Sequence, residues 1–299
     1  MFALLGIPVA MALAGAVSFN IQNQNNGVLV SSGDEREYLL YVPQSYDRTR
    51  PTPLVISMHG GAIWPKVQWD MSRWNELAGR HGFIVVYPSG TGLARQKVWR
   101  AGQGGSPKDV VFISDLIDAL QASYNIDPTR VYADGLSNGA GMAFRLSCEL
   151  SDRIAAVGMV GPAVFLPWER CEGPRPVPTI VFHGTADRWT RYHGGKAWMA
   201  RNHVFPDIPT WAATRARRNG CEPKPMESVV AADVTRSEYR NCTGDAAVEL
   251  YTIHGGGHTW PSGGPLPEWF VGKTTRSIDA SGLMWDFFLA HPLSEAGRN

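Results

Sequence analysis

Ser137 has the sequence setting of a catalytic nucleophile. It lies in the pattern Gly-x-Ser-x-Gly at residues 135–139, after an apolar run at 130–133 that is typical of a strand and before a segment at 139–150 that is typical of a helix. A strand-to-helix turn this tight requires small residues beside the serine, and it exposes the hydroxyl at the carboxyl end of the strand. Because a serine hydroxyl alone is a poor nucleophile, it needs an adjacent base that a carboxylate orients.

Asp187 and His258 have the positions expected of that carboxylate and that base. Asp187 follows the apolar run 179–182, and His258 follows the apolar run 248–253 and three glycines. The carboxyl ends of parallel strands meet at one edge of a sheet, so we expect the three side chains to lie together there. Their order along the chain, Ser, Asp, His, is that of α/β-hydrolase triads. The pattern predicts acyl transfer through a covalent serine intermediate.

The sequence leaves some of these assignments open. His254 is an alternative base, but it precedes the flexible glycines, which favours His258. His183 is predicted to be a structural histidine that holds its loop. The predicted acid could instead cap a helix, and the reserve acids are then Asp152 and Asp207.

A glycine-rich loop is predicted to bind the negative charge that develops on a substrate oxygen. Residues 59–62, His-Gly-Gly-Ala, follow the apolar run 54–58. Backbone N–H groups in such a loop, together with the N–H of the residue after the nucleophile, form an oxyanion hole. We expect Asn138 to supply one donor and either Gly61 or Ala62 to supply the other. An ordinary strand-to-loop turn is the alternative.

Strand-like and helix-like segments alternate along the chain. Ser106 and Pro107 form a typical helix start, as N-cap and first helical residue. Alternation of this kind predicts an α/β fold with a mostly parallel central sheet and helices on both faces, that of an α/β-hydrolase. The expected strands are 37–42, 54–58, 83–87, 130–133, 155–160, 179–182 and 248–253, and the expected helices are 69–80, the segment from 107 onward, 139–150 and 277–289.

Composition narrows the class of protein and of partner. Hydrophobic residues make up 44% of the 299 residues and charged residues 18%, as in a globular protein with a large core. The net charge is +1, without a long run of one sign. This argues against nucleic acid and membrane surfaces as partners, and oligomeric state is not predicted. No internal repeat or linker is visible, so residues 19–299 are expected to form one catalytic domain.

The first residues resemble an export signal. Residues 2–13 are apolar, and Ala14 and Ala16 have the spacing that signal peptidase accepts. No Lys or Arg precedes the apolar run, which is unusual for such a signal, and a buried N-terminal element is the alternative. We expect residues 1–18 to be a signal peptide and the protein to be secreted or periplasmic.

Four cysteines fit an exported protein. Cys148 and Cys171 form one local pair, and Cys221 and Cys242 form another. Four cysteines allow three connectivities, and pairing between sequence neighbours is the simplest of them. The alternative is four reduced thiols in a cytosolic enzyme. The sequence has no Cys-x-x-Cys motif and no histidine-rich cluster, so it does not predict a metal site.

Tryptophans are concentrated near the predicted site loops. Trp64 follows the glycine-rich loop, Trp189 and Trp260 each lie two residues after a predicted triad residue, and Trp269 lies in the loop beyond. Flat rings beside the nucleophile could hold an aromatic acyl group or a polyester chain by stacking. We expect these four residues to bind substrate. Packing in the core or in loops is the alternative for each.

The chain resembles the poly(3-hydroxybutyrate) depolymerase and feruloyl esterase group, carbohydrate esterase family 1 in the broad sense. The resemblance extends over roughly residues 38–288, and the matching motifs are 82–88, 135–139, 183–187, 257–261, 278–280 and 285–288. It implies an α/β-hydrolase fold, ester hydrolysis without a cofactor, export, and disulfides placed much as the local pairs suggest.

Two departures from the family pattern bear on the substrate. Many extracellular depolymerases of crystalline polyester carry a linker and a separate binding domain, and neither is visible here. Ala140 stands where the family often has a further glycine. The predicted function is hydrolysis of hydroxycinnamoyl or polyester carboxylic esters. An acyltransferase with the same triad, an acetyl-xylan deacetylase and a non-catalytic binding relative are the alternatives.

Overall fold

The computed structural model describes residues 25–92, 97–102, 106–167, 170–171, 173–196, 203–264 and 266–294. The expected signal peptide, residues 1–18, lies outside these ranges. Among the described residues, no helix combines the length and the apolar composition needed to cross a bilayer.

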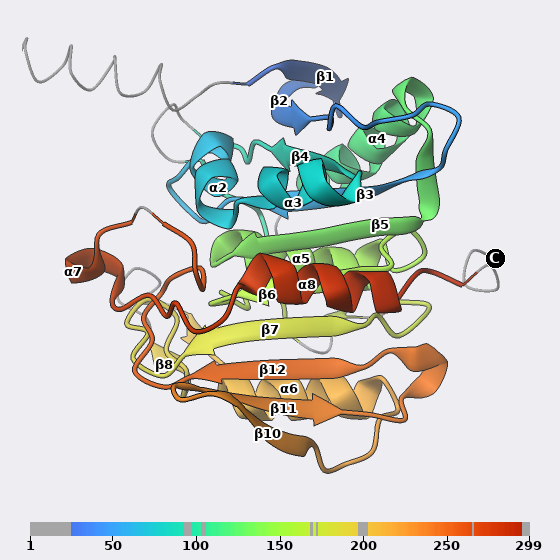
Figure 1. The fold of residues 1–299 in the computed structure, drawn as a ribbon. Helices are drawn as coiled ribbons and strands as arrows, with labels where there is room; N and C mark the ends of the chain where they lie inside the picture. The colour runs from blue at the N-terminus through green and yellow to red at the C-terminus, as the bar shows by residue number, and fades with distance from the viewer. Residues whose placement is uncertain are drawn as a thin grey trace, which may run out of the picture.

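The centre of the molecule is a ten-stranded mixed sheet (Figure 1). Its middle strands are parallel and its two edges are antiparallel hairpins, which confirms the predicted mostly parallel sheet. In spatial order the strands are β1 (Gly27–Ser31), β2 (Asp34–Tyr41), β4 (Ile84–Pro88), β3 (Thr52–Met58), β5 (Ile126–Leu136), β6 (Ala156–Val160), β7 (Thr179–Gly184), β12 (Val248–Ile253), β11 (Val234–Tyr239) and β10 (Met226–Ala231).

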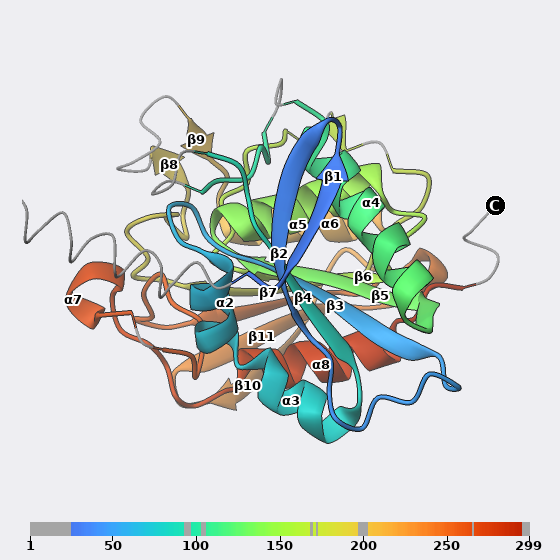
Figure 2. The same ribbon diagram turned by 90° about the horizontal axis from the view of Figure 1, so that it is seen from above.

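Helices cover both faces of the sheet, as Figure 2 shows. On one face lie α2 (Pro65–Ser72), α3 (Trp74–His81) and α8 (Ala280–Ala290), and on the other lie α4 (Lys108–Ser123), α5 (Asn138–Glu149) and α6 (Ile208–Arg218). Every residue of strands β3, β4, β6 and β7 is buried. Such continuous burial explains why these strands appear in the sequence as unbroken apolar runs.

Several elements differ from the expected ones. The single helix expected over 69–80 is two helices, α2 and α3, because Arg73 between them takes a left-handed conformation with φ of 57°. Strand β1, helix α6 and the hairpin of β10 and β11 were not expected. Strand β10 is exposed or half-buried throughout, and strand β11 is buried only at its two ends, so neither appears in the sequence as an apolar run or as a clear alternation.

The four cysteines form two disulfides between sequence neighbours, as predicted. Cys148 bonds to Cys171 and Cys221 bonds to Cys242, across sequence separations of 23 and 21 residues. The first joins the end of helix α5 to the segment after strand β6. The second joins the end of helix α6 to the end of strand β11. Loops of this size stabilise the folded chain by about 3 kcal/mol each on the chain-entropy model.

A buried histidine joins the carboxyl ends of strands β3 and β4. The Nε2 atom of His59 accepts the N–H of Gly90 at 3.0 Å, and its Nδ1–H donates to the carbonyl of Gly60 at 2.7 Å. Because an N–H only donates and a carbonyl only accepts, these partners require the neutral ring. The side chain is completely buried, and this burial lowers the pKa of His59 to about 4 from 6.5.

Acid should destabilise the fold through His59. Between about pH 6.5 and pH 4 the unfolded chain takes up a proton that the folded ring does not, so the free energy of unfolding falls as the pH falls, by about 3 kcal/mol in all. Urea unfolding at several pH values measures this slope. We expect a shallower slope in His59→Asn and an unchanged one in His254→Asn, which alters an exposed histidine. An identical slope in His59→Asn would contradict the assignment.

Candidate active site

The turn between strand β5 and helix α5 presents Ser137 at the carboxyl edge of the sheet. Ser137 has a φ of 55°, a strained value for a residue other than glycine. The neighbouring Gly139 packs against strand β3 so closely that a Cβ atom would lie 2.2 Å from the carbonyl oxygen of Met58. Only glycine fits there, which explains the second glycine of the motif. Ser137 itself is half-buried.

Asp187 and His258 form a buried hydrogen-bonded pair. The Nδ1–H of His258 donates to Asp187 Oδ2 at 2.7 Å, which leaves Nε2 as the atom able to accept a proton. The two residues are only 5% and 7% exposed. Burial alone would raise the pKa of Asp187, but the charge of His258 and hydrogen bonds from His183 and His258 hold it well below its usual range. Asp187 is therefore an ionised acceptor for the imidazole.

Further groups hold the carboxylate in place. The N–H groups of Trp189 and Thr190 donate to Asp187 Oδ1 at 2.7 and 2.9 Å. The hydroxyl of Thr190 bonds both to Asp187 Oδ2 and to the carbonyl of Gly161, each at 3.0 Å. Sequence reasoning missed Thr190, because a threonine three residues after an aspartate is a common turn pattern without catalytic signal.

Two further buried residues, Gly161 and His183, lie beside the Asp187–His258 pair. Gly161 has a φ of 48°, and a Cβ atom there would lie 3.0 Å from Nδ1 of His258. A side chain at this position would therefore press on the imidazole. His183 donates from Nε2 to the carbonyl of Thr190 at 2.6 Å, which agrees with its expected role of holding the loop.

The alternative acids and base lie elsewhere. His254 is exposed and its ring bonds to the hydroxyl of Thr235. Asp207 caps helix α6 by accepting the N–H of Thr210, and Asp152 is an exposed residue beyond helix α5. None of the three borders the cleft that contains Ser137.

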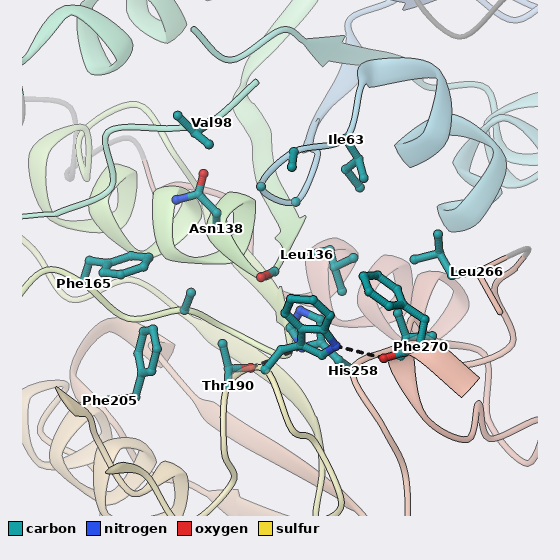
Figure 3. A pocket seen from close by; sticks show the side chains of 17 residues that line it. Ile63, Val98, Leu136, Asn138, Phe165, Thr190, Phe205, His258, Leu266 and Phe270 are labelled. Atoms are coloured by element: carbon teal, nitrogen blue, oxygen red, sulfur yellow. Dashed lines mark hydrogen bonds between the residues drawn. The ribbon is translucent and has the colours of Figure 1, made fainter. Parts of the chain in front are cut away.

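Ser137 and His258 line one cleft of about 520 Å³ (Figure 3). The hydrogen bonds of the described residues include none between them, and such contacts are often long in unliganded enzymes. Apart from Ser137, Asn138, Thr190 and His258, its wall is apolar or glycine: Gly60, Gly61, Ala62, Ile63, Val98, Leu136, Ala163, Phe165, Trp189, Phe205, Leu266, Phe270 and Val271. The site therefore combines a few polar groups with an apolar wall, as ligand sites usually do.

The glycine-rich loop and helix α5 bring three predicted oxyanion donors to this cleft. The N–H of Ala62 already donates to the carbonyl of Lys97 at 2.9 Å. Among the described hydrogen bonds, none uses the N–H of Gly61. Asn138 is the first residue of helix α5, where N–H groups lie outside the helical ladder. The geometry therefore favours Gly61 over Ala62 as the partner of Asn138.

The four tryptophans expected to bind substrate have different surroundings. Trp189 lines the cleft, and its Nε1–H donates to the carbonyl of Phe270 at 3.1 Å. Trp260 is instead a core residue, 1% exposed and bonded to Ser281, so a role in contacting substrate does not fit its position. Trp64 precedes helix α2 as its N-cap and does not line the cleft. Trp269 is 83% exposed on helix α7 (Glu268–Val271), next to the cleft residue Phe270.

A second hollow of about 570 Å³ adjoins the cleft. Phe165 and Phe205 line both spaces, and their rings pack edge to face with centroids 5.2 Å apart. These wall residues carry no recognisable sequence signal, because Phe165 follows strand β6 and Phe205 lies in the short strand β9 (Val204–Phe205). Only the fold brings them beside Ser137.

Comparison with known proteins finds relatives among esterases. Feruloyl esterase B of Piromyces equi is 29% identical over 75% of this chain, and the chain spans only 42% of that protein. Feruloyl esterase C of Emericella nidulans is 26% identical over 89% of this chain and 87% of its own length.

Two further comparisons bear on the fold and on the family that part of the chain matches. An acetyl xylan esterase from Aspergillus awamori superposes with a TM-score of 0.55 at 15% identity, over 75% of this chain and 89% of that one, which agrees with the predicted α/β-hydrolase fold. A family model described as esterase PHB depolymerase matches residues 36–169, the part that contains the glycine-rich loop and Ser137. Residues 36–169 thus match the esterase PHB depolymerase family, within a chain that has the α/β-hydrolase fold.

Proposed function

We propose that the protein is a serine carboxylic-ester hydrolase that acts through an acyl-enzyme. The observation that carries this proposal is the buried His258–Asp187 pair, whose imidazole lines the same cleft as Ser137 on its strained turn. The esterase relatives and the family of residues 36–169 support the same reaction class.

The groups act in turn on the substrate. Ser137 Oγ attacks the ester carbonyl carbon while Nε2 of His258 takes its proton, and ionised Asp187 stabilises the resulting imidazolium. The tetrahedral oxyanion accepts hydrogen bonds from the N–H groups of Gly61 and Asn138. His258 then protonates the leaving alcohol, and a water molecule repeats the sequence on the acyl-enzyme. No step requires a cofactor.

The cleft wall supports hydroxycinnamoyl or polyester substrates. Phe165, Trp189 and Phe270 place aromatic rings around a space of about 520 Å³. Such walls suit an aromatic acyl group or a hydroxyalkanoate chain better than a hydrated sugar, because they stabilise bound apolar surface. Two relatives named feruloyl esterases and a family named for polyester depolymerases agree with these two classes.

The proposal includes action outside the cytosol. The two disulfides support it, because such bonds form and persist in oxidising compartments. A secreted or periplasmic site would also suit cell-wall esters and polyesters, which are external substrates.

Replacing the nucleophile should abolish hydrolysis. We expect Ser137→Ala to lower the kcat for p-nitrophenyl acetate by at least about 10³-fold, because no other group forms the acyl-enzyme. Circular dichroism should show an unchanged fold. Ser123→Ala, on the exposed surface of helix α4, is the matched control and should retain full activity. Wild-type rates in Ser137→Ala would refute the mechanism.

Removing the hydroxyl of Thr190 should weaken the acid–base pair. Thr190→Val keeps the side-chain shape but removes the hydrogen bond to Asp187, and we expect about a tenfold lower kcat because a bond to a charged group is lost. Steady-state kinetics with p-nitrophenyl butyrate measures this effect. Thr235→Val, which loses only a contact with His254, is the comparison. Equal rates in the two variants would show that Thr190 has no part in the reaction.

The aromatic wall should determine selectivity between acyl groups. Phe165→Ala removes a ring from the boundary of the two hollows, so we expect kcat/KM for methyl ferulate to fall about tenfold and that for p-nitrophenyl acetate to change less than about threefold. Leu289→Ala, on the exposed side of helix α8, should leave the ratio of the two constants unchanged. If Phe165→Ala leaves the ratio of the two kcat/KM values unchanged, the acyl group binds away from Phe165.

A further inference from the structure

Residues 97–102, called here the Trp99 segment, lie between the glycine-rich loop and the start of helix α5. The segment contributes Val98 to the wall of the cleft. Its central residue, Trp99, is 3% exposed and does not line the cleft. The hydrogen bonds of the segment go instead to the glycine-rich loop and to the side chain of Asn138, the two places that supply the oxyanion donors in the mechanism.

Two of these bonds reach the glycine-rich loop. The carbonyl of Lys97 accepts the N–H of Ala62 at 2.9 Å. The indole Nε1–H of Trp99 donates to the carbonyl of His59 at 3.0 Å, and the two rings pack with centroids 5.3 Å apart. The loop is thereby held on both sides of Gly61, whose own N–H stays available to the cleft.

Two more bonds reach the residue after the nucleophile. The side-chain amide of Asn138 accepts the N–H of Trp99 at 2.6 Å and donates to its carbonyl at 3.1 Å. This amide therefore pairs with both backbone groups of one residue, as a neighbouring strand would. Among the described hydrogen bonds, none uses the backbone N–H of Asn138. In the proposed mechanism one residue therefore offers its backbone N–H to the oxyanion and is held by its side chain.

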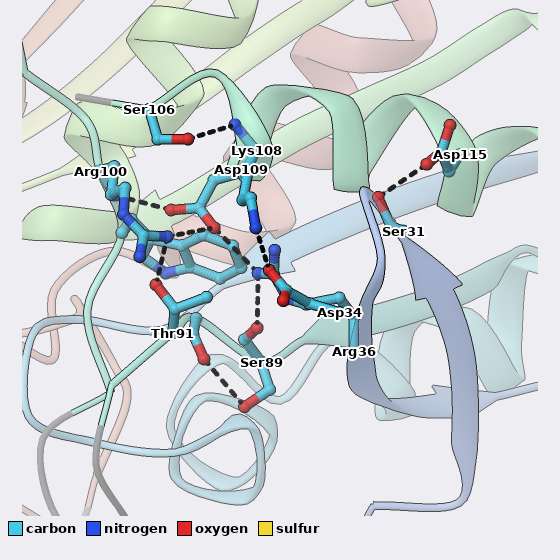
Figure 4. Close-up of polar contacts among 12 residues, drawn as sticks. Ser31, Asp34, Arg36, Ser89, Thr91, Arg100, Ser106, Lys108, Asp109 and Asp115 are labelled. Carbon is cyan, nitrogen blue, oxygen red and sulfur yellow. Dashed lines mark hydrogen bonds and ion pairs between the residues drawn. The ribbon is translucent and has the colours of Figure 1, made fainter. Parts of the chain in front are cut away.

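The far end of the segment is fixed to the body of the domain (Figure 4). The N–H of Arg100 donates to Asp109 at 2.8 Å, and Asp109 forms a buried ion pair with Arg36 at 2.9 Å. The side chain of Arg145, on helix α5, donates to the carbonyl of Arg100. Bonds at both ends leave the segment little freedom to move relative to the sheet.

We propose that Trp99 and the Asn138 side chain form a positioning clamp that sets the separation of the two oxyanion donors. Backbone donors stabilise the oxyanion best when they are in place before the charge develops. If the donors must reorganise during the reaction, the cost of that reorganisation reduces the stabilisation. The clamp joins the donor on the loop to the donor on the helix through one indole and one amide. It rests on the proposed function, and both groups are positioning rather than catalytic, because neither is assigned a contact with the reacting atoms.

Two substitutions test the clamp. Asn138→Leu keeps the side-chain shape and the backbone N–H but removes both bonds to Trp99, and Trp99→Phe removes only the bond to His59. The readout is the ratio of kcat for a p-nitrophenyl ester to kcat for its thiono analogue, in which sulfur replaces the carbonyl oxygen and accepts hydrogen bonds poorly. Loss of stability alone lowers both rates together and leaves this ratio unchanged.

We expect Asn138→Leu to lower the oxygen-to-sulfur ratio about tenfold and Trp99→Phe about threefold, with KM for the oxygen ester changed less than about twofold. The double variant should lose little more than Asn138→Leu alone, because both act through one segment. Trp285→Phe is the matched control, since Trp285 is also buried but packs on Phe83 at the opposite face of the sheet. Its ratio should equal that of the wild type.

The outcomes separate the clamp from the proposed function. If the wild-type protein hydrolyses neither ester, the proposed function is overturned and the clamp with it. If the wild type is active and both variants keep its ratio, the clamp alone is overturned. If thermal unfolding shows that Asn138→Leu is not folded, the ratio measured for Trp99→Phe tests the clamp instead. This variant keeps an aromatic ring in the same space and removes a single hydrogen bond.

Discussion

The close packing of helix α5 on the end of strand β3 is the constraint on which the rest of the site depends. At Gly139 the two backbones leave no space for a side chain, since a Cβ atom would lie within 2.5 Å of the carbonyl oxygens of both Met58 and His59. That contact brings the start of the helix beside the glycine-rich loop. The proposed nucleophile and both proposed donors therefore take their positions from one backbone contact.

The buried charge of Asp187 is the second organising feature. A carboxylate removed from water is costly unless hydrogen bonds replace its hydration. Here the N–H groups of Trp189 and Thr190, the hydroxyl of Thr190 and the imidazole of His258 supply them. The same bonds fix the direction of the imidazole, so the stability of the charge and the orientation of the base have a common origin.

The features predicted from the sequence share one physical basis. Strands β5, β7 and β12 are apolar runs that end in short loops, so the residues after them could be assigned to one edge of the sheet. The convergence of Ser137, Asp187 and His258 at that edge could therefore be predicted from the sequence. Local cysteine spacing likewise gave the correct pairing, because the simplest connectivity was the one adopted.

The features that were not predicted depend on contacts between distant segments. The proposed preference for Gly61 over Ala62 depends on the carbonyl of Lys97, and the cleft wall includes Phe205 from a two-residue strand. Trp260 looked like a site residue from its distance to His258 along the chain, but its indole turns into the core. The pattern of apolar runs predicts which strand ends meet at one edge of the sheet. The direction of each side chain depends instead on packing between distant segments, which the sequence does not display.

The two disulfides divide the active site along the chain. Ser137 precedes Cys148, whereas Asp187 lies between the two bridged loops and His258 follows both. No proposed triad residue lies inside a bridged loop. Cys148 lies on helix α5, whose N-cap is Ser137, so the first bridge ties the helix behind the proposed nucleophile to the segment after strand β6. The second bridge ties the segment after helix α6 to the segment after strand β11, which pairs with the strand that leads to His258. Each bridge thus supports an element behind the site and leaves the loops that carry the three side chains without a covalent constraint.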